Sequence, residues 1–210
     1  MNGNKSAPAN VKTNGNSSNT NKSSSNYNTR TSGSEDEEEE EGASPSFRRG
    51  YAFGQQKDYD NAIKQYTLAI EENPKYGLAY YNRGWCYHNK KDYNLAIADY
   101  TDAVRYSPDY KNAYLSRGRI YYFQKEYAAA IKDYDKVISL DPNNSDHYVD
   151  RGNAHDDSGD SDSAIADYGK AIDLDPKNID AYKNRAITYR RQGKNGLAES
   201  DERQTKILEK

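Results

Sequence analysis

The 210-residue chain carries 30 Lys and Arg residues against 33 Asp and Glu residues, and the formal net charge of −3 at pH 7 argues against nucleic-acid binding, which needs a basic surface. Because Cys86 is the single cysteine, neither an intramolecular disulfide nor a thiolate metal cluster can form. The sequence holds no apolar run long enough for a signal peptide or a membrane span, so we expect an intracellular, cytoplasmic protein without membrane contact.

Residues 1–42 differ in composition from the rest of the chain. Residues 1–34 are rich in Asn, Ser, Thr and Gly, and they contain too little apolar surface to offset the entropy of folding. Residues 35–41 form an acidic run, EDEEEEE, whose like charges keep it extended. We therefore predict a disordered tail that solubilises the protein. Ser34, which precedes the acidic run, is in addition a candidate site for an acid-directed kinase.

From residue 43 onward the chain repeats itself with a period of 34 residues. Four sets of identical residues, which we call ladders, recur at this spacing: Gly50, Gly84, Gly118 and Gly152; Ile63, Ile97, Ile131 and Ile165; Tyr66, Tyr100, Tyr134 and Tyr168; Pro74, Pro108, Pro142 and Pro176. The ladders divide the chain into units at residues 43–76, 77–110, 111–144, 145–178 and 179–210, which we number repeats one to five.

Each repeat contains two predicted helices, as repeat two shows. Apolar and small residues recur at helical spacing over residues 77–89 and again over residues 92–106. Asp92 stands where the second helix needs an N-cap. Pro108 ends that helix because proline lacks an amide hydrogen and disfavours helical conformation just before it. The repeat is therefore predicted to be an antiparallel helical hairpin.

The residues of this hairpin resemble a known pattern. The order Tyr80, Arg83-Gly84, Tyr87, Ala96, Tyr100 and Pro108 is similar to the tetratricopeptide repeat pattern W-x2-L-G-x2-Y, A-x3-F, P. Tyrosine replaces tryptophan and phenylalanine, and arginine replaces leucine. The resemblance implies an all-α fold, a right-handed α-solenoid of antiparallel helix pairs, over residues 43–210.

Repeats four and five depart from the pattern. In repeat four, His155 and Ser161 replace tyrosines of the earlier repeats, so we expect it to be the loosest internal repeat. In the second helix of repeat five, Glu202 stands in the Tyr168 place and Thr205 in the Ala171 place. A terminal repeat must present a polar face to water, so this helix is predicted to be the cap. Its inward residues are expected to be Leu197, Ala198 and Leu208.

Arginine and aspartate form two further ladders. The seventh residue of every repeat is arginine: Arg49, Arg83, Arg117, Arg151 and Arg185. On the second helices Asp99, Asp133, Asp167 and Asp201 recur, with Gln65 in repeat one. An Arg–Asp pair that bridges the two helices of each repeat explains both ladders.

The sequence indicates no catalytic or metal site. His147 and His155 lie near several aspartates of repeat four, but Gly159 does not occupy the sixth place of a calcium loop. The two histidines also lack the one-turn spacing of a helical zinc site. There is no glycine-rich phosphate loop and no nucleophile elbow. We therefore expect neither enzymatic activity nor a cofactor.

The resemblance implies that the first helices line a concave groove that binds another protein. A peptide or helix of the partner would bring apolar anchors to repeats one to three and positive charge to the aspartates of repeat four. The candidate partner-binding residues are Phe47, Tyr51, Tyr81, Asn82, Trp85, His88, Arg119, Tyr122, Asp146, Asp150, Asn153, Lys183 and Arg190.

Several alternatives stay open at this point. A co-chaperone-type adaptor would hold an acidic C-terminus in a carboxylate clamp, but Asn82 alone fits the clamp in the register that begins at repeat one. The related 35-residue hairpin repeats bind RNA, which the 34-residue step and the neutral repeat region disfavour. The protein could also be the recognition arm of a larger enzyme assembly, or self-associate through its terminal repeats.

Overall fold

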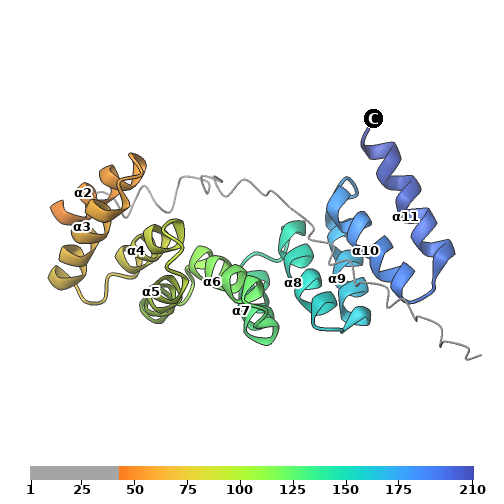
Figure 1. Cartoon of the computed structure of the whole chain (residues 1–210), viewed down its shortest axis with the longest axis horizontal. Coiled ribbons are helices and arrows are strands. Elements are labelled where there is room, and N and C mark those ends of the chain that lie inside the picture. Colours follow the sequence, from red (N-terminus) through yellow and green to blue (C-terminus); the bar gives the residue numbers. More distant parts are fainter. Residues whose placement is uncertain (1–42) are drawn as a thin grey trace, which may run out of the picture. The chain divides into compact units, whose positions relative to one another are not determined.

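The computed structural model describes residues 43–210, and this part is helical without a strand (Figure 1). The first helices of the repeats are α2 (Pro45–Gln55), α4 (Gly77–Asn89), α6 (Lys111–Phe123), α8 (Ser145–Asp157) and α10 (Ile179–Arg191). The second helices are α3 (Tyr59–Glu72), α5 (Tyr93–Tyr106), α7 (Tyr127–Leu140), α9 (Ser161–Leu174) and α11 (Asn195–Leu208). The predicted disordered tail and the Ser34 site lie outside the described residues.

Each first helix packs against the second helix of its own repeat, and α4, α6, α8 and α10 also pack against the second helix of the preceding repeat. This arrangement confirms the predicted all-α solenoid of helix pairs. Its stability is built from contacts within each repeat and between neighbours, as in other stacked arrays.

Side chains cap some of the helix starts. The carboxylate of Asp58 accepts a hydrogen bond from the backbone N–H of Asn61, and Asp160 caps α9 through Ser163 in the same way. Asp92 occupies the predicted N-cap position of α5, but its side chain makes no capping hydrogen bond. The predicted position of that helix start is confirmed, whereas the predicted side-chain cap is not formed.

The turns inside the repeats all use a left-handed residue. Repeats one to three place Lys57, Lys91 and Lys125 there, with φ angles of 60°, 67° and 63°. Repeats four and five place Gly159 and Gly193 there, with φ angles of 95° and 73°. A side chain in this conformation costs about 1 kcal/mol, which glycine avoids. The turns of repeats one to three therefore carry a conformational free-energy cost that the turns of repeats four and five avoid.

A tyrosine packed on a glycine forms the centre of repeats one to four. The tyrosines Tyr66, Tyr100, Tyr134 and Tyr168 are buried. In each case the ring lies so close to the glycine of the first helix that an added Cβ would meet it, at 2.8 Å in repeat one and 2.7 Å in repeat four. The glycine and tyrosine ladders of the sequence are therefore two sides of one contact.

The predicted Arg–Asp pairs are present. The guanidinium of Arg83 donates from Nε and Nη2 to the two oxygens of Asp99 at 2.9 and 2.8 Å. Equivalent bidentate pairs join Arg117 to Asp133, Arg151 to Asp167 and Arg185 to Asp201. In repeat one, Arg49 Nε donates to Gln65 Oε1 at 2.8 Å. Each pair holds the first helix of its repeat against the second helix.

The same arginines also reach the preceding repeat, which the sequence analysis did not foresee. Nη1 of Arg83 donates to Thr67 at 3.1 Å, Nη1 of Arg117 to Thr101 at 3.0 Å, and Nη1 of Arg151 to Asp135 at 2.7 Å. We call the place held by Thr67, Thr101 and Asp135 the junction place. At the fourth junction this place holds Gly169, and an added Cβ there would lie 3.6 Å from Nη1 of Arg185.

Replacing Gly169 with aspartate should stabilise the protein. The new carboxylate would meet Arg185 as Asp135 meets Arg151, and a partly exposed pair of this kind contributes about 0.2–1 kcal/mol. Removal of a glycine from the helix interior adds to the gain. Urea unfolding of the G169D variant is expected to give a higher midpoint than G169N, whose side chain has a similar size and helix propensity but carries no charge. Equal midpoints for the two variants would contradict the junction contact.

The last helix, α11, only partly matches its predicted packing. Ala198 is buried as expected, and Leu208 is half-buried. Leu197 is 52% exposed, so its predicted inward position was wrong. It corresponds to Leu95 of repeat two, which is also exposed, because this place points away from the neighbouring helices in both repeats. The buried face of α11 is formed instead by Ala198, Asp201 and Thr205.

Candidate functional site

The accessible aromatic residues of the candidate groove lie in repeats one and two. Tyr51 on α2 is 41% exposed. Trp85 on α4 is half-buried, and its ring meets that of Tyr59 edge-on at 5.6 Å. The Tyr59 hydroxyl donates to Asn89 at 3.4 Å, so Tyr59 supports Trp85 from the preceding repeat. Tyr59 was not among the candidate residues.

Phe47 does not belong to this surface, and its prediction as a groove residue was wrong. It is 1% exposed and packs against Tyr66 and Tyr76, with ring centroids 5.5 and 5.0 Å apart. Tyr81, at the equivalent place in repeat two, is half-buried against Tyr100 and Tyr110. This place faces the core and the loop to the next repeat, so a large side chain there is drawn inward.

Two polar candidates on α4 lie beside Trp85 in sequence. The Asn82 amide donates from Nδ2 to the carbonyl of Leu78 in its own helix at 2.9 Å. The His88 ring lies 5.7 Å from that of Tyr93. Burial lowers the pKa of His88, and the charge of Arg119 lowers it further. A neutral imidazole therefore faces repeat three.

The candidates of repeats three and four bind one another. Arg119 on α6 donates from Nη2 and Nε to Asp150 Oδ2 on α8, at 3.0 and 3.3 Å. Burial raises the pKa of Asp150, while the charge of Arg119 opposes this effect. One residue pair further along, the Tyr122 hydroxyl donates to Asp157 Oδ2 at 2.6 Å. These contacts join the first helices of the two repeats directly.

Repeats four and five are joined in the same manner. Asn153 accepts from Asn184 at 2.8 Å and from the Tyr168 hydroxyl at 2.9 Å. Arg191 on α10 forms an ion pair with Asp156 on α8. Asp146 accepts from Asn178 at 3.1 Å but stays exposed.

The two basic candidates of repeat five are bonded within their own repeat. Lys183 pairs with Glu209 at 2.7 Å. Arg190 donates to both oxygens of Glu202 at 2.8 and 2.9 Å. Glu202 therefore has a structural partner in the place where the other repeats carry a buried tyrosine.

The surface formed by the candidate residues thus has two parts of different character. Over repeats one and two it offers aromatic rings, and over repeats three to five its charges largely neutralise one another. The bonds that Asp156, Asp157 and Arg191 form across the repeats were not predicted from the sequence. The opposite charges of Asp156 and Arg191, about one repeat apart, were the available signal for their pair, but only the packing of α8 against α6 and α10 decides which groups meet.

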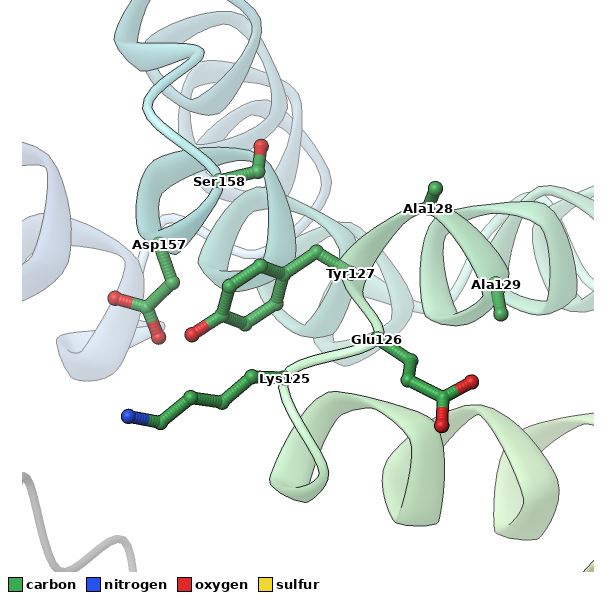
Figure 2. Close-up of a pocket in the computed structure, with 7 residues that line it drawn as sticks. All are labelled: Lys125, Glu126, Tyr127, Ala128, Ala129, Asp157 and Ser158. Atoms are coloured by element: carbon green, nitrogen blue, oxygen red, sulfur yellow. The ribbon is translucent and has the colours of Figure 1, made fainter.

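A shallow open hollow of about 560 Å³ lies between the turn of repeat three and the end of α8. Figure 2 shows the Tyr127 ring between the side chains of Asp157 and Lys125. The hollow exists because Ala128 and Ser158 are small. At the equivalent place between repeats one and two, Asp60 pairs with Lys90, and between repeats four and five Gln192 bonds to Asp162.

His147 lies buried at the junction of repeats three and four. Its Nε2 is 3.3 Å from Asp141 Oδ2, which also pairs with Lys111 at 2.6 Å. Burial lowers the pKa of His147, an effect that Asp141 and Asp150 partly offset and that Lys111 reinforces. The folded state therefore favours the neutral ring.

This lowered pKa predicts a loss of stability in mild acid. A histidine whose pKa is lower in the folded state costs nothing above its unfolded value of about 6.5, and it destabilises the fold as the pH falls below that value. His88 acts in the same direction. We expect the free energy of unfolding to fall between about pH 6.5 and pH 5. The H88Q/H147Q variant should show a smaller fall in the same urea titrations, and an unchanged slope would refute this assignment.

The described residues show little that could carry covalent chemistry. Cys86 is buried, and burial raises its pKa to about 12, so it is a thiol rather than a nucleophilic thiolate. Within residues 43–210 no three His, Cys, Asp or Glu side chains gather as metal ligands would. Over the same range, no helix combines the length and the apolar character that crossing a bilayer requires.

These features define an α-helical repeat protein of the solenoid class. Sequence models described as TPR repeat or tetratricopeptide repeat match residues 43–76, 77–110, 112–144, 133–166 and 152–193. The chain belongs to the tetratricopeptide repeat family, whose fold serves protein interaction. A search of curated protein sequences found no match.

 Solved structures with the same fold include MamA proteins and YrrB. The crystal structure of a MamA protein superposes with a TM-score of 0.74 at 25% identity, covering 78% of this chain and 90% of that one. MamA 41-end from Desulfovibrio magneticus RS-1 gives 0.73 at 19% identity, covering 80% and 97%. YrrB, described as a TPR protein with an unusual peptide-binding site, gives 0.72 at 20% identity, covering 82% and 89%. The latter two likenesses show the fold alone.

Proposed function

We propose that residues 43–210 form a non-catalytic scaffold that binds a peptide or helix of a partner protein along its first helices. The observation that carries this proposal is the pair of accessible aromatic rings on neighbouring first helices, Tyr51 on α2 and Trp85 on α4. Large aromatic side chains on an accessible surface dominate the energetics of many interfaces. YrrB, which has the same fold, is described as having a peptide-binding site, and this supports a peptide as the ligand.

The strongest contact is proposed to lie over repeats one and two. In repeats three to five a ligand would have to compete with bonds already present, such as Arg119–Asp150 and Tyr122–Asp157. Breaking a partly buried pair leaves a charge without its partner, which is costly. Over repeats one and two, a ligand gains contact with Trp85 without breaking an ion pair. The aromatic part of the groove should therefore provide most of the affinity.

The charged part of the groove is proposed to orient the ligand. Asp146 and Asp157 remain exposed although each accepts one hydrogen bond. A positively charged end of the ligand would meet these carboxylates. Exposed charges of this kind act over a distance that salt shortens, so rising ionic strength should weaken binding only moderately.

Trp85 allows a direct test because it is the single tryptophan of the chain. Peptides selected from a random library displayed on phage against residues 43–210 are expected to change the Trp85 fluorescence on binding. Replacing Trp85 with alanine should weaken the selected peptides by about 30-fold, as the loss of a hot-spot residue does. The matched control is L95A, because Leu95 is exposed on the second helix α5 of the same repeat. Its affinity should stay unchanged.

Two outcomes would refute the proposal. If the library yields no peptide that binds, residues 43–210 lack an accessible peptide site. If W85A and L95A bind the selected peptides equally well, the ligand occupies another surface. Circular dichroism of both variants checks that the helical fold is retained.

A further inference from the structure

The junction place gives the array a direction, because each junction joins two unlike surfaces. The leading surface is the arginine at the seventh place of a repeat. The trailing surface is the junction place on the second helix of the repeat before it. At three junctions the arginine donates Nη1 to the junction place, which holds Thr67, Thr101 or Asp135. The fourth junction keeps the register, with Gly169 beside Arg185.

The junction place of repeat five holds a cation. Arg203 stands on α11 one period after Gly169, and it is exposed. A hairpin stacked on α11 in the register of the other junctions would bring its seventh-place arginine to Arg203. In a second copy of this chain that residue is Arg49, on α2. Two guanidinium groups would then meet where every other junction offers an acceptor or a space.

A second substitution on α11 acts in the same direction. Ile70 and Ile138 belong to apolar clusters that include residues of the following repeat, and Ile172 packs in a cluster with Ala181 of repeat five. One period after Ile172 the chain has Lys206, which is exposed. Stacking of a further hairpin would cover this ammonium group without a partner, which is unfavourable.

We propose that Arg203 and Lys206 close the outer face of α11 to the α2 face of a second copy, so that the protein does not extend head-to-tail. Contacts like those at the internal junctions would otherwise add one copy after another, because a head-to-tail interface that does not close into a ring grows into a filament. The two side chains therefore disfavour the stacking of α2 of one copy on α11 of another. The proposal concerns this one pair of faces and does not depend on the groove.

Sedimentation equilibrium of the full chain over about a hundredfold range of concentration tests the proposal. In the released variant, R203E/K206I, a carboxylate would accept from Arg49 and isoleucine would restore the internal apolar place. We expect the wild type to show no association through these faces, and the released variant to associate with increasing concentration. Adding R49A to the released variant should lower its association constant by about tenfold or more, because the new acceptor loses its donor.

A control variant, K170I/K177E, introduces the same side chains at exposed positions of repeat four. It should behave as the wild type does. The proposal is overturned if the released variant stays monomeric, if R49A leaves its association unchanged, or if the control associates equally. It is also overturned if the wild type associates and R49A weakens that association, because α2 would then already bind a second copy.

Discussion

Replacing Arg117 with leucine should lower the free energy of unfolding by about 3–5 kcal/mol, as loss of one partner of a buried ion pair does. Arg117 donates to both oxygens of Asp133 at 2.8 and 2.7 Å, and Asp133 is buried. The variant would leave this carboxylate buried without its cation. The bond to Thr101 in the preceding repeat would be lost as well. Urea unfolding followed by circular dichroism measures the effect.

Two further variants separate the ion pair from the packing of the arginine. In R49L the partner that is lost is the neutral amide of Gln65, so a smaller destabilisation is expected. In R117L/D133L the stranded charge is also removed, and a large part of the stability should return, since an apolar pair can replace a buried ion pair at little cost. If R117L is no less stable than R49L, the buried pair does not hold the hairpin.

Replacing Gly152 with alanine should destabilise the protein by about 1–3 kcal/mol, the usual cost of overpacking a core. The new Cβ would lie 2.7 Å from Cε1 of Tyr168 and 3.3 Å from Cβ of Asp167. Tyr168 is 1% exposed, and its hydroxyl donates to Asn153 at 2.9 Å, so the ring has little room to move. This strain should exceed the gain of about 1 kcal/mol from alanine in a helix.

The matched control for this variant is G169A. Gly169 is also helical, but an added Cβ would make only ordinary contact with Arg185, at 3.6 Å. G169A should therefore raise stability by up to about 1 kcal/mol. The chain itself supports this contrast, because repeat five carries Ala186 in the glycine place and Glu202 in the tyrosine place. Equal effects of the two alanine substitutions would contradict the close glycine–tyrosine contact.

Contacts inside one repeat could be predicted from the sequence because they occur several times. The arginine and aspartate ladders, and the small and aromatic residues at helical spacing, recur at a single period. A contact that occurs in four repeats places the same residue types at four equivalent positions of the sequence. The bidentate pair of Arg83 with Asp99 could therefore be inferred from residue types alone.

Contacts between first helices could not be predicted in the same way. The pairs Arg119–Asp150 and Tyr122–Asp157 each use residues that occur in one repeat only. Which groups meet depends on the offset between α6 and α8, and no recurring residue of the sequence indicates this offset. Phe47 was misplaced for a related reason. The repeat pattern gives its place on α2, but the Tyr76 ring that buries it belongs to the loop before repeat two.

The junction place also bears on how such a chain could change in length during evolution. Deleting residues 77–110 would join Tyr76 to Lys111 and bring Thr67 to Arg117 in place of Thr101. The new neighbours would offer the same hydroxyl to the same guanidinium. Whole hairpins in this region could thus be duplicated or lost by recombination while the hydrogen bond between neighbouring repeats is retained.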